Sequence, residues 1–171
     1  MNPPSLNYQQ ACPEVAAAQA TIRLDRMQTE FRRGRPVVME PADPGAPVVM
    51  LAAVETLSAA RLQDLVLTAG TPRLLLTAER LRAIGGSQVS GARSLLPGSP
   101  ITVERVQRLA AVLPGAATTA EAADMVGVRP AGPALEGVLR LTKRARLVPA
   151  LLMFELRHCM LAGDIGSSLR N

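Results

Sequence analysis

Short apolar segments alternate with helix-like segments over residues 31–86, and turn residues stand at nearly every junction. Three apolar segments have the length and composition of β-strands, namely residues 37–39, 48–53 and 74–76. The first two are separated by residues 40–47, whose three prolines exclude a helix or a central strand. The pattern therefore predicts three short strands, with a proline turn between the first and the second.

Two helices are predicted in the same stretch. Ser58 is a favoured N-cap residue before a run whose apolar positions share one helix face, and Gly70 is a natural end. Thr77 is a second N-cap residue, and the two glycines at 85–86 end the helix that follows it. Strands that alternate with helices of about ten residues favour an α/β fold. We expect a small mixed sheet of three to five strands with helices packed against it.

A longer helix is predicted ahead of this stretch, from Glu14 to Arg33, and Gly34 is its natural end. Its apolar positions form one stripe and its charged residues take the other faces. The stripe consists of Ala20, Leu24, Met27 and Phe31. Residues 1–13 contain prolines and polar residues with little to bury, so we expect a loose N-terminal tail there.

The middle of the chain shows a weaker pattern. Residues 85–100 are rich in Gly and Ser without a clear period, which is typical of a surface linker. Thr102 and Thr118 are favoured N-cap residues for two further helices, and Glu121 completes a capping box with Thr118. Gly127 is the expected end of the second of these helices.

A final helix and a strand are predicted beyond that point. Residues 129–133 have the composition of a turn, and Pro133 suits the first position of the helix. Residues 147–156 form a β-like apolar run, and its uncharged part, 147–154, is a candidate dimer interface. The buried side of the helix is expected to consist of Leu135, Val138, Leu139 and Thr142.

Composition narrows the classes of partner. Aromatic residues make up only 2% of the 171 residues, so the core must consist of Leu, Val, Ile and Met. The net charge of +5 comes almost wholly from arginine, because Lys143 is the only lysine. Basic residues gather at 32–35 and 143–146, which are predicted helix C-termini where the helix dipole favours cations. Without stacking aromatics, this pattern does not indicate a nucleic-acid partner.

The chain shows no membrane or export signal. Its N-terminus lacks the basic start and apolar core of a signal peptide, and its longest uncharged apolar run is far below the roughly 20 residues that span a bilayer. The two cysteines, Cys12 and Cys159, are far apart and indicate no disulfide framework. We therefore expect a cytoplasmic protein without a membrane partner.

Three segments resemble the opening of 3,4-dihydroxy-2-butanone 4-phosphate synthase, a riboflavin-pathway enzyme often fused ahead of GTP cyclohydrolase II. They are residues 34–38 (GRPVV), 52–55 (AAVE) and 75–81 (LLTAERL). The resemblance implies a truncated, degenerate synthase-like domain over residues 14–156. It also implies the α/β (α+β) fold of that family, whose active members pair as homodimers.

The resemblance also assigns chemistry to the loop after residue 39. In active synthases this loop is long and acidic, and its carboxylates hold magnesium and move protons on a sugar phosphate. A hard divalent cation needs such clustered carboxylate oxygens. Here the loop carries only Glu40 and Asp43. We interpret it as catalytically inactive, while a weak metal site on these two carboxylates stays open.

A second family motif is incomplete near residue 132. The resemblance implies that a His-Thr pair at the start of the following helix binds phosphate and assists chemistry at the metal. In this chain only Gly132 and Glu136 can be matched to that motif. Pro133 and Ala134 offer neither a proton carrier nor a ligand. The resemblance therefore concerns the fold, and the site is interpreted as lost.

Residues 157–171 resemble the start of a GTP cyclohydrolase II core. The spacing of Gly163-Asp164 and residues 168–170 (SLR) matches that family. By resemblance, Arg157 and His158 are candidate substrate-binding residues and Cys159 is a candidate metal ligand. The family holds zinc with three cysteines, and Asn171 stands where the second should be. This segment is interpreted as vestigial, or alternatively as an unrelated polar terminus.

Three functions follow as hypotheses. The first is a non-catalytic riboflavin-biosynthesis protein without bound cofactor, acting as a homodimer or on a complete cyclohydrolase partner. The second is a residual magnesium-dependent lyase of ribulose 5-phosphate, using Glu40 and Asp43 with Arg35 and Arg129 on the phosphate. The third is an arginine-rich binding module. Zinc and GTP belong to the complete cyclohydrolase family, and magnesium to the synthase relatives.

Overall fold

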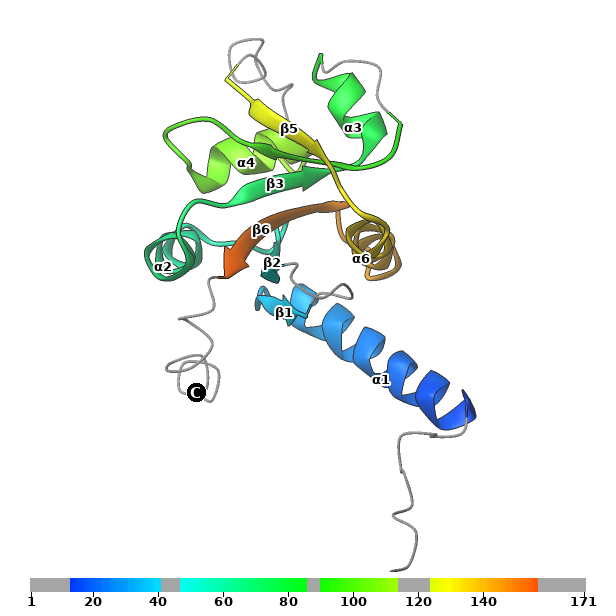
Figure 1. Ribbon diagram of the computed structural model, residues 1–171. Coiled ribbons are helices and arrows are strands. Elements are labelled where there is room, and N and C mark those ends of the chain that lie inside the picture. The colour runs from blue at the N-terminus through cyan, green and yellow to red at the C-terminus, as the bar shows by residue number, and fades with distance from the viewer. Residues whose placement is uncertain (1–12, 41–46, 86–89, 114–123, 157–171) are drawn as a thin grey trace, which may run out of the picture.

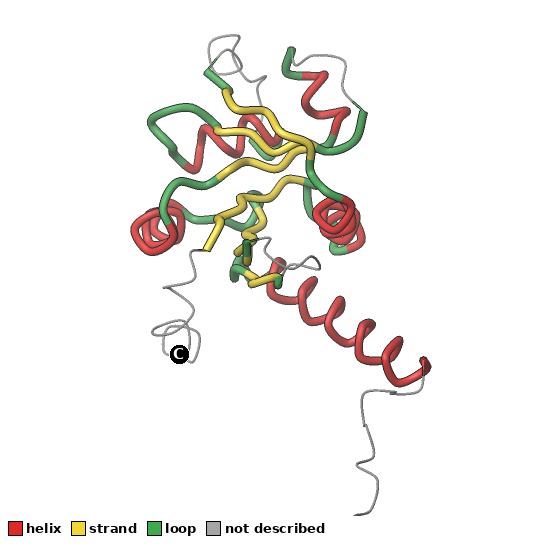
Figure 2. The backbone as a smooth tube through the Cα atoms, in the orientation of Figure 1, coloured by secondary structure: helices red, strands yellow, loops and turns green. Residues whose placement is uncertain are grey.

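The computed structural model describes residues 13–40, 47–85, 90–113 and 124–156. They form a six-stranded sheet with helices on both faces (Figures 1 and 2). The described helices are α1 (Pro13–Arg32), α2 (Ala59–Ala69), α3 (Ala78–Ala83), α4 (Val103–Ala110) and α6 (Pro133–Arg144). The strands are β1 (Val37–Met39), β2 (Val48–Ala53), β3 (Arg73–Leu76), β4 (Arg93–Leu96), β5 (Val126–Pro130) and β6 (Ala150–Leu156).

The strand order is β1-β2-β6-β3-β4-β5, and each of these neighbouring pairs is antiparallel. The predicted α/β fold is confirmed, and the four predicted strand regions become β1, β2, β3 and β6. The sheet is larger than expected because β4 and β5 extend it beyond β3.

The predictions for two segments were wrong, because the structure has a strand in each of them. β4 lies in the expected linker 85–100, and β5 covers Gly127 and part of the expected turn 129–133. All five residues of β5 are exposed, so it has no alternation of buried and exposed residues for a sequence pattern to show. Gly127 does not end a helix; it sits in β5 at a φ of +62°, beside an irregularity in the pairing with β4.

β6 lies in the middle of the sheet, between β2 and β3. Its side chains alternate between two cores, as the period of a strand requires. Leu151 and Met153 enter the core under α1 and α6, while Leu152 and Phe154 enter the core under α2, α3 and α4. The expectation that residues 147–154 form a dimer interface is therefore wrong, because neighbouring strands and helices already cover this strand.

The three N-cap residues predicted for α2, α3 and α4 are confirmed. The side chains of Ser58, Thr77 and Thr102 accept hydrogen bonds from backbone N–H groups three residues later, at 3.2 to 3.3 Å. Gly70 ends α2, and Pro133 takes the first turn of α6, as predicted. Residues 118–123 of the helix predicted from Thr118 lie outside the described residues, and residues 124–127 at its expected end are not helical.

α1 is anchored only at its C-terminal end. Phe31 is fully buried and Met27 packs on the same core, but Leu24 is 44% exposed and Ala20 is exposed. The predicted stripe therefore exists, and its first half is uncovered where α1 projects beyond the sheet (Figure 1). No helix among the described residues is long and apolar enough to cross a membrane.

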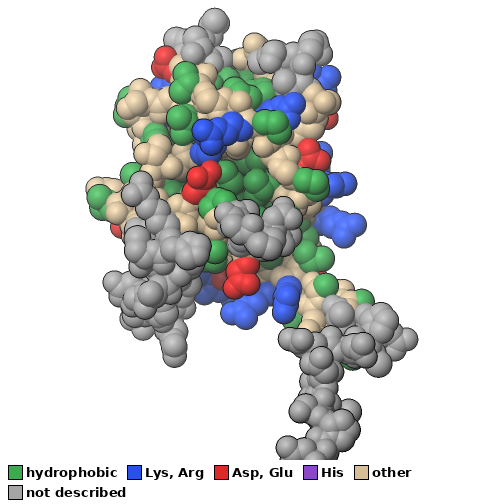
Figure 3. Space-filling view, viewed as in Figure 1, with side chains coloured by type: hydrophobic (Ala, Val, Ile, Leu, Met, Phe, Trp, Pro, Cys, Tyr) green, Lys and Arg blue, Asp and Glu red, His purple; other side chains and the backbone are tan. Residues whose placement is uncertain are grey.

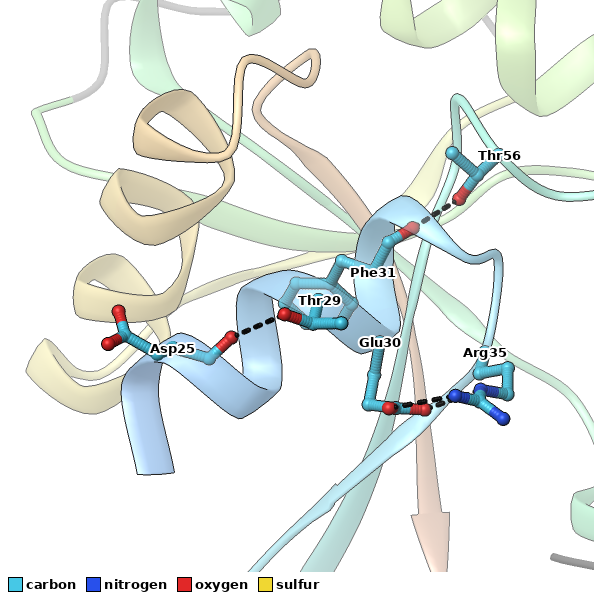
Figure 4. A network of polar contacts seen from close by, with 6 residues as sticks. All are labelled: Asp25, Thr29, Glu30, Phe31, Arg35 and Thr56. Carbon is cyan, nitrogen blue, oxygen red and sulfur yellow. Dashed lines mark hydrogen bonds and ion pairs between the residues drawn. The ribbon is translucent and has the colours of Figure 1, made fainter. Parts of the chain in front are cut away.

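Polar contacts hold the anchored end of α1 (Figure 4). The Thr56 hydroxyl donates to the Phe31 carbonyl oxygen at 2.8 Å, and Arg35 Nη2 donates to Glu30 Oε1 at 3.0 Å. Gly34 turns the chain between α1 and β1 at a φ of +69°. A Cβ there would lie 2.7 Å from the Thr56 carbonyl oxygen, so the close approach requires glycine.

Candidate functional site

Only one of the two acidic residues expected to hold magnesium lies in the described part of the chain. Glu40 follows β1 and is exposed, while Asp43 lies outside the described residues. Over the described ranges, no group of three or more His, Cys, Asp or Glu side chains could hold a metal ion. The described residues therefore do not fit the carboxylate cluster that Mg²⁺ prefers. Arg157, His158 and Cys159 also lie outside the described part of the chain, so their roles stay predictions.

The suggested phosphate cluster of Arg35 and Arg129 is wrong. Arg35 precedes β1 and is paired with Glu30, whereas Arg129 belongs to β5. β1 and β5 are the two opposite edges of the sheet. Five strand spacings of roughly 4.8 Å separate these edges, which puts the strands about 24 Å apart. The two arginines cannot bind one phosphate together.

The start of α6 has a structural role. Gly132 is its N-cap residue and makes no side-chain capping bond. Glu136 Oε1 instead accepts a hydrogen bond from the Ala92 backbone N–H at 3.0 Å. A Cβ on Gly91 would lie 2.6 Å from the same oxygen, so glycine makes room for this carboxylate. Glu136 thus ties α6 to the segment before β4.

The structure reveals a cluster of polar side chains that the sequence did not predict. Arg73, Ser94, Arg129 and Glu155 lie on the sheet face that also carries Leu75 and Met153, and we call them the sheet-face cluster. Arg129 and Glu155 are exposed, because α1 and α6 cover other parts of this face. Figure 3 shows basic and acidic side chains around an apolar hollow in the middle of the molecule.

Arg73 and Ser94 are the buried members of the cluster, with 8% and 5% of their surface exposed. Arg73 Nε donates to Ser94 Oγ at 3.1 Å, and Arg73 Nη2 donates to the Ser94 carbonyl oxygen at 2.9 Å. Nη2 also donates to the Gly127 carbonyl oxygen, so one side chain joins β3, β4 and β5. Burial lowers the pKa of Arg73, the nearby charge of Arg129 lowers it further, and the charge of Glu155 opposes both.

The sheet-face cluster can hold an anion more readily than it can catalyse proton transfer. It offers two guanidinium groups and a serine hydroxyl as donors. It contains one proton acceptor, Glu155, and neither a thiol nor an imidazole. Nothing in the sequence indicated that Arg73, the first residue of β3, belongs to this cluster. Its hydrogen-bond partners Ser94 and Gly127 lie 21 and 54 residues away along the chain.

A small open pocket of about 210 Å³ lies between α3, the segment before β4 and α6. Its lining mixes apolar residues with charges of both signs, including Glu79, Glu136, Arg140 and Lys143. The pKa of Glu79 is lowered, first by a backbone hydrogen bond and then by the Thr77 hydroxyl, with smaller contributions from Arg82 and Lys143. Glu79 lies in the first turn of α3, and the Glu136 carboxylate already accepts from the Ala92 N–H, so the pocket presents no catalytic set.

Comparison with known proteins identifies the fold. No protein-family model and no curated protein matches the chain. A two-domain 3,4-dihydroxy-2-butanone 4-phosphate synthase from A. baumannii is similar, with a TM-score of 0.56 and 18% identity over 81% of this chain. The Candida albicans synthase has a TM-score of 0.55 and 18% identity over 79% of this chain. A cation-free synthase structure has a TM-score of 0.57 and 16% identity over 78%.

This similarity shows a 3,4-dihydroxy-2-butanone 4-phosphate synthase-like fold. The chain spans about half of the two-domain A. baumannii protein (51%), and 80% and 74% of the other two. At 16–18% identity the likeness concerns the arrangement of helices and strands, and function has to be argued from the site.

Proposed function

We propose that this chain is a riboflavin-biosynthesis protein that keeps the synthase fold without synthase activity. In this proposal it acts by binding to a complete GTP cyclohydrolase II. The main support for the proposal is the start of α6. Pro133 and Ala134 lie in its first turn, and the Glu136 carboxylate accepts a hydrogen bond from the Ala92 N–H. No side chain in that turn is left to bind phosphate or carry a proton.

The loop after β1 supports the same reading. Its sequence carries two carboxylates, Glu40 and Asp43, which is fewer than the cluster of oxygen ligands that a hard divalent cation prefers. The resemblance of residues 157–171 to a cyclohydrolase supports the choice of partner. Cys159 is the one cysteine in that segment, so the zinc and its water would come from the partner's own site.

The enzymatic part of the proposal is tested with the purified chain. It is incubated with ribulose 5-phosphate and Mg²⁺, and separately with GTP and Zn²⁺. We expect neither a four-carbon phosphate nor formate. A four-carbon phosphate that Glu40→Gln abolishes would favour the residual lyase, and formate release above that of Cys159→Ser would overturn the non-catalytic assignment.

The partner is tested by mixing the chain with a complete GTP cyclohydrolase II from the same source. We expect the two to elute together in size-exclusion chromatography, at a salt-independent volume. Separate elution would refute the partnership. Association with RNA or DNA that weakens steeply with added salt would instead favour the arginine-rich binding module, because phosphate contacts release counterions.

A further inference from the structure

The structure brings together two groups of arginines that are far apart in the sequence. Arg32 Nε, at the end of α1, donates to the Ala145 carbonyl oxygen just after α6, at 3.0 Å. The C-termini of the two helices therefore meet, and Arg33, Arg144 and Arg146 are the sequence neighbours of the two contacting residues. Together with Arg32 these three arginines form what we call the basic junction, and all four are exposed.

Helix dipoles account for only part of this charge. Each helix C-terminus carries roughly −0.5 of an elementary charge, so two of them offset about one of the four guanidinium charges. Glu55 offsets another, because its Oε2 accepts from the Val148 N–H at 2.6 Å and so lies just beyond α6. Within the described ranges, the side chains of Arg33, Arg144 and Arg146 form neither a hydrogen bond nor an ion pair. The basic junction therefore keeps uncompensated positive charge.

The outer face of α1 leads away from the basic junction and mixes apolar with basic side chains. Val15, Ile22, Arg26 and Arg33 follow one another at intervals of seven, four and seven residues, so they share one side of the helix. This side lies opposite Phe31, which anchors α1 in the core. Val15 and Ile22 are 49% and 67% exposed, on the part of α1 that projects beyond the sheet (Figure 1).

We propose that the basic junction and the outer face of α1 form a docking surface for an acidic amphipathic segment of a partner protein. Guanidinium groups bind carboxylates through two parallel hydrogen bonds, and Val15 and Ile22 offer apolar contacts at the other end of the surface. Ile22 and Arg33 are about 17 Å apart along the helix axis, so about three turns of a partner helix would span the surface. Charge complementarity selects an acidic segment as the occupant.

This surface suits a protein better than a nucleic acid. Protein–nucleic acid interfaces are more polar than protein–protein interfaces, whereas Val15 and Ile22 contribute exposed apolar area here. Unpaired bases stack on aromatic side chains, and the two phenylalanines, Phe31 and Phe154, are completely buried. The inference does not depend on the proposed function, because the occupant is defined by its charge and apolar side chains and not by cyclohydrolase activity.

The experiment uses a fluorescein-labelled helical peptide of about 20 residues as the probe, with Glu along one half of a face and Leu along the other half. Its binding to the full chain is followed by fluorescence anisotropy at constant ionic strength. The double variant Arg33→Gln/Arg144→Gln should bind the peptide about tenfold more weakly, since two exposed ion pairs are lost. Arg61→Gln/Arg82→Gln is the matched control. It removes the same charge from α2 and α3, which cover the other sheet face, and should leave affinity unchanged.

Ile22→Ala tests the apolar half of the surface and should weaken peptide binding about fivefold. Alanine is the better helix former, so a loss would not come from a weakened α1. Leu67→Ala is its control, because Leu67 is 78% exposed on α2, and it should have no effect. All the substituted side chains are exposed, so the variants should fold as the parent does, which circular dichroism would verify.

Three outcomes would overturn the docking surface. Equal loss in the two double variants would show attraction by net charge only. An unchanged affinity in Ile22→Ala, or the absence of saturable peptide binding, would remove the amphipathic partner. An RNA duplex that binds more tightly than the peptide, and loses affinity in Arg33→Gln/Arg144→Gln, would assign the basic junction to a nucleic acid instead.

Discussion

Several charged side chains that are buried or half-buried bind backbone groups far along the chain. Glu136 accepts from the Ala92 N–H, and Arg73 donates to the carbonyl oxygens of Ser94 and Gly127. Arg80 likewise donates to the carbonyl oxygens at the end of α4. Such bonds satisfy backbone groups that would otherwise be costly to bury, so these side chains act as structural links.

The link made by Glu136 gives a prediction at the scale of one residue. Glu136→Ala leaves the Ala92 N–H without its acceptor and should lower the free energy of unfolding by about 1–2 kcal/mol. Glu136→Gln keeps an acceptor oxygen and should lose clearly less. Urea unfolding of the two variants measures the difference, and equal losses would contradict the assigned bond.

At the scale of an element, α1 is a helix of which only the C-terminal part packs against the rest of the protein. Val15 and Ile22 are 49% and 67% exposed, and the described side chains from Ala17 to Arg26 are all exposed. Contacts to β1, β2 and α6 come from its C-terminal part, around Phe31. An isolated helix of about twelve residues is marginal in water, so the free part lacks the packing that stabilises most helices.

Hydrogen exchange should therefore divide α1 into two parts. Backbone amides of residues 17–24 should exchange orders of magnitude faster than those of residues 28–32, because local opening of the free part breaks no tertiary contact. Exchange followed by mass spectrometry or NMR on the intact chain measures this. Uniform protection along α1 would mean that another surface covers its first half.

At the scale of the whole molecule, β6 separates two cores. Leu151 and Leu152 are neighbours in sequence, and both are completely buried. Leu151 belongs to the core under α1 and α6, and Leu152 to the core under α2, α3 and α4. The central strand therefore carries both layers, and its continuous apolar run reflects burial on both faces.

This arrangement predicts that Leu151→Ala and Leu152→Ala each lower the free energy of unfolding by about 2–5 kcal/mol. Leu67→Ala is the matched control, because Leu67 is 78% exposed, and it should change stability by less than about 0.5 kcal/mol. Thermal or denaturant unfolding compares the three variants. A small loss at Leu151 alone would show that α1 and α6 do not form a stable second layer.

The amino-acid sequence by itself determined the elements whose signals are local. The N-cap residues Ser58, Thr77 and Thr102 each begin a helix, and the apolar runs around Val49, Leu75 and Leu152 became strands. A cap needs only a side chain and a backbone group three residues later, and a buried strand needs only a short apolar run.

Only the tertiary structure decided the edge of the sheet and the composition of the candidate site. β5 is exposed and became a strand through pairing with β4, and Arg73 found its partner Gly127 54 residues away. Arg35 and Arg129, which the sequence analysis grouped as one phosphate cluster, lie at opposite edges of the sheet. These outcomes depend on which strands lie side by side, and strand pairing is a long-range property that periodicity along the chain does not encode.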